Sequence, residues 1–199
     1  MYKRQGPDGV DDALLPALLA LSDVMATGLH GAVLAGVTEG STVAVIGDGA
    51  VGLCAVLGAR AVLGAERVVL MSRHEDRAAL GRTFGATDVV AARGEEGIAA
   101  VRELTGGRGV PYVVEAVGTP QSWEMALGMA RVGGRVGAVG VPHTSPEIPL
   151  FPIVRNHLTV SAGIAPVRKY LPDLIARVMD GRLDPVSYTH LTLPTNREV

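Results

Sequence analysis

The feature that most constrains the fold is the segment 43–53, where an apolar run leads into three spaced glycines. The run Val-Ala-Val-Ile is typical of a buried strand, and Gly47, Gly49 and Gly52 follow it at the start of a helical pattern. Gly47 permits a tight turn, Gly49 lets the backbone approach a pyrophosphate, and Gly52 lets the helix pack on the strand. The first N–H groups of that helix would be free to bind phosphates. The segment therefore predicts a strand, a phosphate-binding turn and a helix.

A glycine turn of this kind is weak evidence for nucleotide binding when it occurs alone. The alternation of strand and helix patterns along the rest of the chain makes this evidence specific. Short β-branched runs predict six strands, at 42–47, 67–72, 87–92, 111–117, 135–141 and 158–163. Helical patterns lie at 50–63, 75–84, 95–104, 121–131 and 167–181, and Pro149 and Pro152 leave only a short helix in the fifth connection. Two linking helices, at 12–21 and about 24–36, precede the series. The sequence predicts an α/β fold, a Rossmann-type doubly wound parallel sheet of six strands.

The composition fits this class and argues against several others. The chain has 26 glycines and only 4% aromatic residues, as expected where helices lie close on a parallel sheet. Its net charge of −2 gives no reason to expect nucleic acid or a membrane surface as partner, and its apolar runs are too short to span a membrane. A single cysteine, Cys54, excludes an internal disulfide and a zinc site made of cysteines alone. Because no signal-peptide pattern is present, a cytoplasmic location is expected.

Both ends of the chain are expected to be foreign to the folded protein. Residues 186–195, VSYTHLTLPT, can be encoded by GTC TCT TAT ACA CAT CTG ACG CTG CCG ACG, which resembles a transposase-type sequencing adapter. The opening MYKRQ can be encoded by GTG TAT AAG AGA CAG, whose reverse complement is the same adapter sequence. We therefore expect adapter-derived tails at 1–5 and 186–199, a helical linker from a missing domain at 6–36, and the dinucleotide-binding domain at 37–185. A frayed native tail is the alternative.

The residues after the second predicted strand indicate which dinucleotide is bound. An Asp or Glu there binds the ribose 2′-hydroxyl of NAD and repels the 2′-phosphate of NADP. This chain has Ser72 and Arg73 instead, and Arg77 follows one helical turn later. A hydroxyl and guanidinium groups can accept a phosphate, so we expect NADP rather than NAD. The alternative is that the arginines are solvated charges compensated by Glu75 and Asp76.

The segment 21–32, LSDVMATGLHGA, resembles the zinc-type medium-chain dehydrogenase/reductase family, in its formaldehyde-dehydrogenase-like branch. That family has a TG-containing helix leading out of its catalytic domain. The resemblance implies that Asp23 is a zinc ligand and that Thr27 lies beside the nicotinamide. Without the resemblance, Asp23 is a candidate helix N-cap.

Two further segments strengthen the resemblance. EAVGTP at 115–120 resembles the family's loop near the cofactor, and GGRVGAVGVP at 133–142 resembles its fifth strand, whose end would border the nicotinamide carboxamide. The resemblance covers essentially all of 6–185. The implied cofactor-binding residues are Thr27, Gly47, Gly49, Val51, Gly52, Ser72, Arg73, Arg77, Val117, Val139, Gly140 and Val141.

The resemblance also implies a function for the intact protein. Zinc would act as a Lewis acid while hydride passes between the nicotinamide and a small alcohol or aldehyde. The family's other zinc ligands lie in an amino-terminal domain that this sequence does not contain, so we assign no catalytic residue and expect the chain alone to be inactive. A homo-oligomer paired through the edge of the strand at 158–163 is expected. Two alternatives remain: a non-catalytic nucleotide-binding module, and a zinc-free quinone or enoyl reductase of the same superfamily.

Overall fold

The computed structural model describes residues 12–142 and 147–185, and its strands form one parallel sheet. The strands are β1 (Thr42–Ile46), β2 (Arg67–Met71), β3 (Asp88–Val90), β4 (Val110–Glu115), β5 (Ala130–Ala138) and β6 (Thr159–Ala162). They lie in the order β3-β2-β1-β4-β5-β6, with every neighbouring pair parallel. This is the order of a doubly wound sheet whose direction reverses between β1 and β4, so the predicted fold is confirmed. The tails expected at 1–5 and 186–199 lie outside the described residues.

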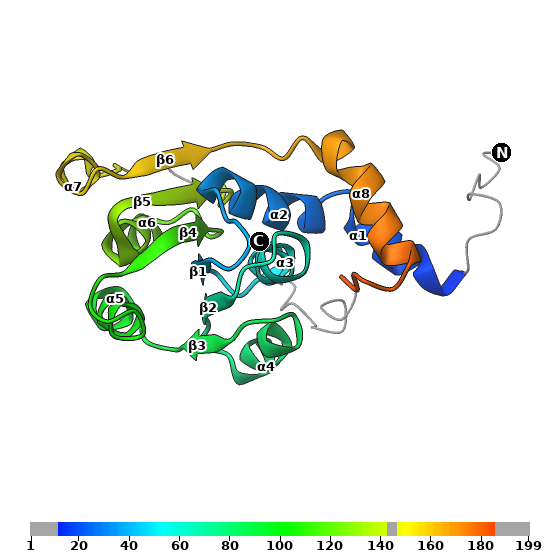
Figure 1. Cartoon of the computed structure of the whole chain (residues 1–199), viewed down its shortest axis with the longest axis horizontal. Coiled ribbons are helices and arrows are strands. Elements are labelled where there is room, and N and C mark those ends of the chain that lie inside the picture. Colours follow the sequence, from blue (N-terminus) through cyan, green and yellow to red (C-terminus); the bar gives the residue numbers. More distant parts are fainter. Residues whose placement is uncertain (1–11, 143–146, 186–199) are drawn as a thin grey trace, which may run out of the picture.

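Helices cover both faces of the sheet, as Figure 1 shows: α2, α3 and α4 lie on one face and α5 and α6 on the other. The helices are α1 (Leu15–Ala20), α2 (Val24–Ala35), α3 (Ala50–Leu57), α4 (Glu75–Thr83), α5 (Gly94–Glu103), α6 (Pro120–Met129), α7 (Leu150–Arg155) and α8 (Val167–Met179), with a 3₁₀ turn at Asp12–Leu14 and a π-helical turn at Gly58–Val62. Each face has its own apolar core, around Leu53 on one side and Trp123 on the other. Because both faces are covered, the central strands β1 and β4 are mainly apolar, with the buried Glu115 at the end of β4 as an exception.

The helix α2 belongs to the layer that covers the sheet. Met25, Ala26 and Leu29 are buried against α3 and the strands. A Cβ on Gly28 would lie 2.4 Å from the backbone nitrogen of Ala55, so glycine is what allows α2 and α3 to approach this closely. α2 therefore packs as part of this domain.

Several elements differ from their predicted bounds, and the two largest differences lie at the end of α3 and at the junction of α6 with β5. The helix predicted at 50–63 widens into the π-helical turn at Gly58–Val62, where a Cβ on Gly58 would lie 3.0 Å from the Cα of Leu29. The helix predicted at 121–131 ends at Met129, and β5 begins at Ala130 rather than at 135 because Ala130 pairs with Val110 before an irregularity in the ladder. Both differences arise from contacts between distant segments.

The strands also end earlier than predicted, and this places the candidate residues in loops. Gly47, Ser72 and Val117 each follow a strand directly or within two residues, and residues 139–141 follow β5. These loops lie at the carboxyl edge of the sheet, where doubly wound folds bind ligands.

Among the described residues, no single helix is long and apolar enough to cross a membrane. The pair Asp12–Ala20 and Val24–Ala35 would satisfy length and composition together, but it is bent by 41° at its break.

Candidate functional site

The glycine turn between β1 and α3 has the geometry of a phosphate cradle. Gly47 has φ +117°, a value that L side chains rarely adopt, and a Cβ on Gly52 would lie 2.0 Å from the carbonyl oxygen of Gly47. A Cβ on Gly49, in contrast, would meet no atom within 4 Å. The first helical bond runs from Leu53 N to Gly49 O at 2.9 Å, so the preceding N–H groups of α3 have no helical acceptor. The turn thus combines a fixed shape, open space above Gly49 and free donors, which suits a pyrophosphate.

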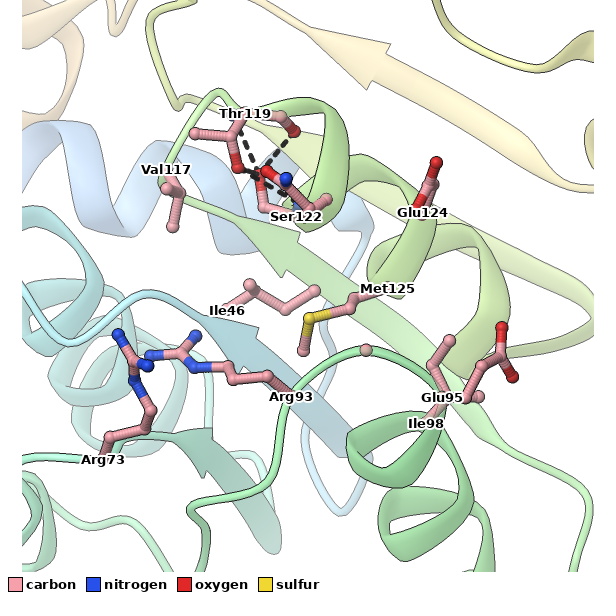
Figure 2. Close-up of a pocket in the computed structure, with 12 residues that line it drawn as sticks. Ile46, Arg73, Arg93, Glu95, Ile98, Val117, Thr119, Ser122, Glu124 and Met125 are labelled. Carbon is pink, nitrogen blue, oxygen red and sulfur yellow. Dashed lines mark hydrogen bonds between the residues drawn. The ribbon is translucent and has the colours of Figure 1, made fainter.

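A cavity of about 370 Å³ opens on one side of this turn, between the loops that follow β2, β3 and β4 (Figure 2). Figure 2 shows Ile46 and Met125 in the middle of this cavity and the guanidinium groups of Arg73 and Arg93 side by side at one end. The lining residues are Ile46, Arg73, Arg93, Gly94, Glu95, Ile98, Val117, Thr119, Gln121, Ser122, Glu124 and Met125. An apolar slot with a cationic end suits a flat ring that carries an anionic group.

Arg73 and Arg93 come from different loops and carry like charges at close range. Burial lowers the pKa of Arg93, and the positive charge of Arg73 lowers it further, while Asp48 acts in the opposite direction. Within the described ranges, neither guanidinium has a hydrogen bond or ion pair with the protein. Two neighbouring guanidinium groups without a carboxylate partner are arranged to bind an anion.

Ser72 and Arg77 are both bonded to the same carboxylate, that of Asp48. The Ser72 hydroxyl donates to Asp48 Oδ2 at 2.8 Å, and Arg77 Nη1 donates to Asp48 Oδ1 at 3.3 Å. Asp48 is 7% exposed and Ser72 is 2% exposed. Of the three residues that the sequence assigned to a 2′-phosphate, Arg73 therefore lines the cavity, whereas Ser72 and Arg77 have partners within the protein.

A second cavity, of about 620 Å³, lies where α2 and α3 meet the ends of β5 and β6. It gathers six of the residues that the sequence singled out: Asp23, Thr27, Val51, Val139, Gly140 and Val141. The other lining residues are Ala116, Ala138, Pro142, Ala162, Gly163, Ile164 and Ala165, so the walls are mainly apolar. Segments that lie more than 100 positions apart in the sequence, such as 23–27 and 139–141, meet here.

Asp23 precedes α2 but does not cap it. Its side chain makes no capping hydrogen bond to the helix, and its Oδ1 lies 3.4 Å from the hydroxyl oxygen of Thr27. The alternative interpretation of Asp23 as an ordinary N-cap therefore finds no support in the geometry. The carboxylate lines the second cavity instead.

Glu115, at the end of β4, is hydrogen-bonded to the loop that follows its own strand. Its Oε1 accepts from the N–H groups of Val117 and Gly118 at 2.8 Å each, and its fully buried Oε2 has no partner among the described residues. A Cβ on Gly140 would lie 2.6 Å from that Oε2. Glu115 thus holds the loop after β4 against the end of β5.

Sequence reasoning missed Asp48, Arg93 and the bonding role of Glu115. Arg93 directly follows the predicted third strand, and a loop at the carboxyl end of a parallel strand was the available signal for it. Asp48 lies between two of the motif glycines, and no sequence pattern shows that its side chain turns toward Ser72.

The residues present fit a dinucleotide better than they fit a metal. In 12–142 and 147–185 no group of three or more His, Cys, Asp and Glu side chains could hold a metal ion, and a catalytic zinc normally takes three protein ligands. Asp23 offers one oxygen ligand, so any zinc site built on it needs further ligands from outside these residues.

Comparisons with known proteins agree with this geometry. A family model described as zinc-binding dehydrogenase matches residues 50–179. The chain is similar to a probable zinc-binding alcohol dehydrogenase of Mycobacterium tuberculosis, with 39% identity over 191 residues, 94% of this chain and 47% of that protein. It is 33% identical over 160 residues to an NADP-dependent isopropanol dehydrogenase of Clostridium beijerinckii, 78% of this chain and 45% of that protein. Among solved structures, an alcohol dehydrogenase from Thermus sp. ATN1 superposes with a TM-score of 0.79 at 35% identity, covering 86% of this chain and 49% of that one. The chain spans about half the length of the curated relatives it matches.

Proposed function

This chain belongs to the zinc-binding dehydrogenase family, and from that membership we propose that it is the NADP-binding half of an alcohol or aldehyde oxidoreductase. The observation that carries the proposal is the glycine turn flanked by two cavities, one ending in an arginine pair and one lined by Asp23 and Thr27. The turn would hold the pyrophosphate, and the cavities would take the two ends of the dinucleotide.

The second cavity is where the nicotinamide would lie and where hydride transfer would take place. A bound nicotinamide supplies the hydride donor or acceptor, and a bound zinc supplies a Lewis acid for an alcohol or carbonyl oxygen. Val51, Val139 and Val141 give this space mainly apolar walls, which suit the face of a nicotinamide ring. Asp23 offers a carboxylate oxygen on the same wall as Thr27, and the remaining zinc ligands would come from residues beyond those described.

Three observations support NADP over NAD. The end of β2 carries no Asp or Glu, since Ser72 and Arg73 stand there. Arg73 and Arg93 present two guanidinium groups at one end of the first cavity. A relative with 33% identity is named as NADP-dependent.

The test is the substitution Arg73→Ala in the 199-residue chain, with NADP and NAD affinities measured by calorimetry. Loss of one charge-assisted contact to a phosphate should cost roughly 1.5–3 kcal/mol, which weakens NADP binding by about tenfold or more. The affinity for NAD should not change, because NAD has no 2′-phosphate. Arg108→Ala is the control, since Arg108 lines a different cavity, near the amino ends of the strands. Equal losses for both cofactors in Arg73→Ala would contradict the proposed preference.

We also propose that the intact protein pairs with a second copy through β6. This strand is the outer edge of the sheet, and the adjoining α7 exposes Leu150, Phe151 and Val154. An unpaired strand edge beside apolar side chains favours association. Sedimentation velocity should show a dimer that Phe151→Asp weakens, and a monomer at all concentrations would contradict the proposal.

A further inference from the structure

The glycine turn carries a carboxylate that the phosphate-binding motif does not require. Asp48 stands between Gly47 and Gly49, and its side chain extends toward the end of β2, where Ser72 donates to it at 2.8 Å. At the end of β2, an acid residue would select NAD. The chain therefore has no acid on β2 itself but has one beside it, supplied by the neighbouring loop.

The side chains around the Asp48 carboxylate carry more positive charge than negative charge. Arg77 pairs with Asp48 at 3.3 Å, while Arg73 and Arg93 have no hydrogen bond or ion pair in the described part of the chain, although the charge of Asp48 also acts on Arg93. At this end of the cavity one carboxylate faces three guanidinium groups, while the carboxylates of Glu95 and Glu124 lie at the other end (Figure 2), so the local charge is positive. A 2′-phosphate carries negative charge, so the net field attracts it even though Asp48 repels it.

We propose that Asp48 is a specificity-determining residue that limits the preference for NADP and keeps NAD an acceptable cofactor. The inference rests on the proposed function, because it presumes that a dinucleotide occupies the glycine turn. Asp48 acts in two ways: its charge repels a 2′-phosphate, and its bonds hold Ser72 and Arg77 so that neither donates to that phosphate. An unused lone pair of the carboxylate can accept from the 2′-hydroxyl of NAD.

The substitution Asp48→Asn separates these effects from folding. Asparagine has the same shape, and its side-chain oxygen can still accept from Ser72. The negative charge disappears, and Arg77 loses its ion pair and becomes free to turn toward the cavity. Each change strengthens NADP binding and none strengthens NAD binding.

The experiment measures dissociation constants of the 199-residue chain and its variants for NADP and NAD by calorimetry. We expect Asp48→Asn to bind NADP about fivefold to tenfold more tightly, with NAD binding unchanged or weaker. A damaged structure would weaken both cofactors, so a gain of affinity cannot arise from misfolding. Asp48→Ala removes the same charge and should shift the ratio in the same direction if the Asn variant does not fold.

The matched control is Asp76→Asn, which removes one carboxylate from the exposed first turn of α4. Its ratio of NADP to NAD affinity should stay within about twofold of the unmodified chain, because solvent screens an exposed charge. If the unmodified chain binds both cofactors but the folded Asp48→Asn and Asp48→Ala variants keep or lower the ratio, this inference is wrong and the proposed function stands. If the unmodified chain binds neither cofactor, the proposed function fails and the inference fails with it.

Discussion

Single residues of the glycine turn divide into those that build the fold and those that leave room for a ligand. A Cβ on Gly52 would lie 2.0 Å from the Gly47 carbonyl oxygen, whereas a Cβ on Gly49 would meet nothing within 4 Å. We expect Gly52→Ala to lower the free energy of unfolding by roughly 1–3 kcal/mol through overpacking. Gly49→Ala should cost at most about 1 kcal/mol of stability, since Gly49 is the N-cap of α3, but it should weaken NADP and NAD together because the added methyl group fills the space above the turn. Calorimetry and thermal melting measure both quantities. Full cofactor affinity in a folded Gly49→Ala variant would show that phosphates do not bind here.

The role of Asp23 can be decided by the stability of α2. Because Asp23 makes no capping hydrogen bond, Asp23→Ala should change the free energy of unfolding by less than about 0.5 kcal/mol. Thr119→Ala is the control: Thr119 accepts from the backbone N–H of Ser122 at 3.2 Å, in a capping box, and its loss should cost about 1 kcal/mol. In a protein that also contains the other zinc ligands, Asp23→Ala should lower zinc content while nucleotide binding persists. A large loss of stability with unchanged zinc would make Asp23 a helix cap.

At this scale the sequence predicted residues that belong to a local motif and missed those that meet across loops. The motif is recognisable because the spacing of its glycines, Gly47, Gly49 and Gly52, is typical of a single phosphate-binding turn. The bond between Ser72 and Asp48 joins residues 24 positions apart, and nothing in either local pattern indicates it.

Among the elements, β2 and β3 are joined by an ion pair whose effect on stability depends on pH. Arg67 donates two hydrogen bonds to Asp88, at 2.8 Å and 2.7 Å, and these lower the pKa of the Asp88 carboxyl. A lowered folded-state pKa means that the stabilisation is present above the unfolded value of about 3.9 and is lost as the pH falls through the folded value. Because the pair is partly exposed, Asp88→Asn should cost about 1 kcal/mol or less at pH 7. Urea unfolding of both proteins should show this difference shrinking below pH about 4. A difference that stays constant to pH 3 would assign the effect to packing.

The predicted boundaries of helices and strands were right where the local sequence pattern determines them. They were wrong where contacts with distant segments determine them. Strands β1 and β2 begin at their predicted residues because β-branched runs start there. The early start of β5 and the π-helical turn depend on Val110 and Leu29, which come from other segments. The order of the strands follows from the doubly wound class rather than from any single element.

For the whole molecule, the chain spans about half the length of the curated relatives it matches. We expect the 199-residue chain to hold no stoichiometric zinc and to oxidise no alcohol, because Asp23 is the one zinc ligand that the family resemblance implies and a catalytic zinc normally takes three ligands from the protein. Metal analysis and an NADP reduction assay measure this. A full zinc complement in the isolated chain would show that its ligands have been misassigned.

Calorimetric titration of the unmodified 199-residue chain with NADP and with NAD would show whether the chain is a dinucleotide-binding half that prefers NADP. We expect one saturable site for NADP and weaker binding of NAD at the same site, since on the proposed function Arg73 and Arg93 would bind the 2′-phosphate that NAD lacks. Absence of saturable binding for both, or tighter binding of NAD than of NADP, would contradict this expectation.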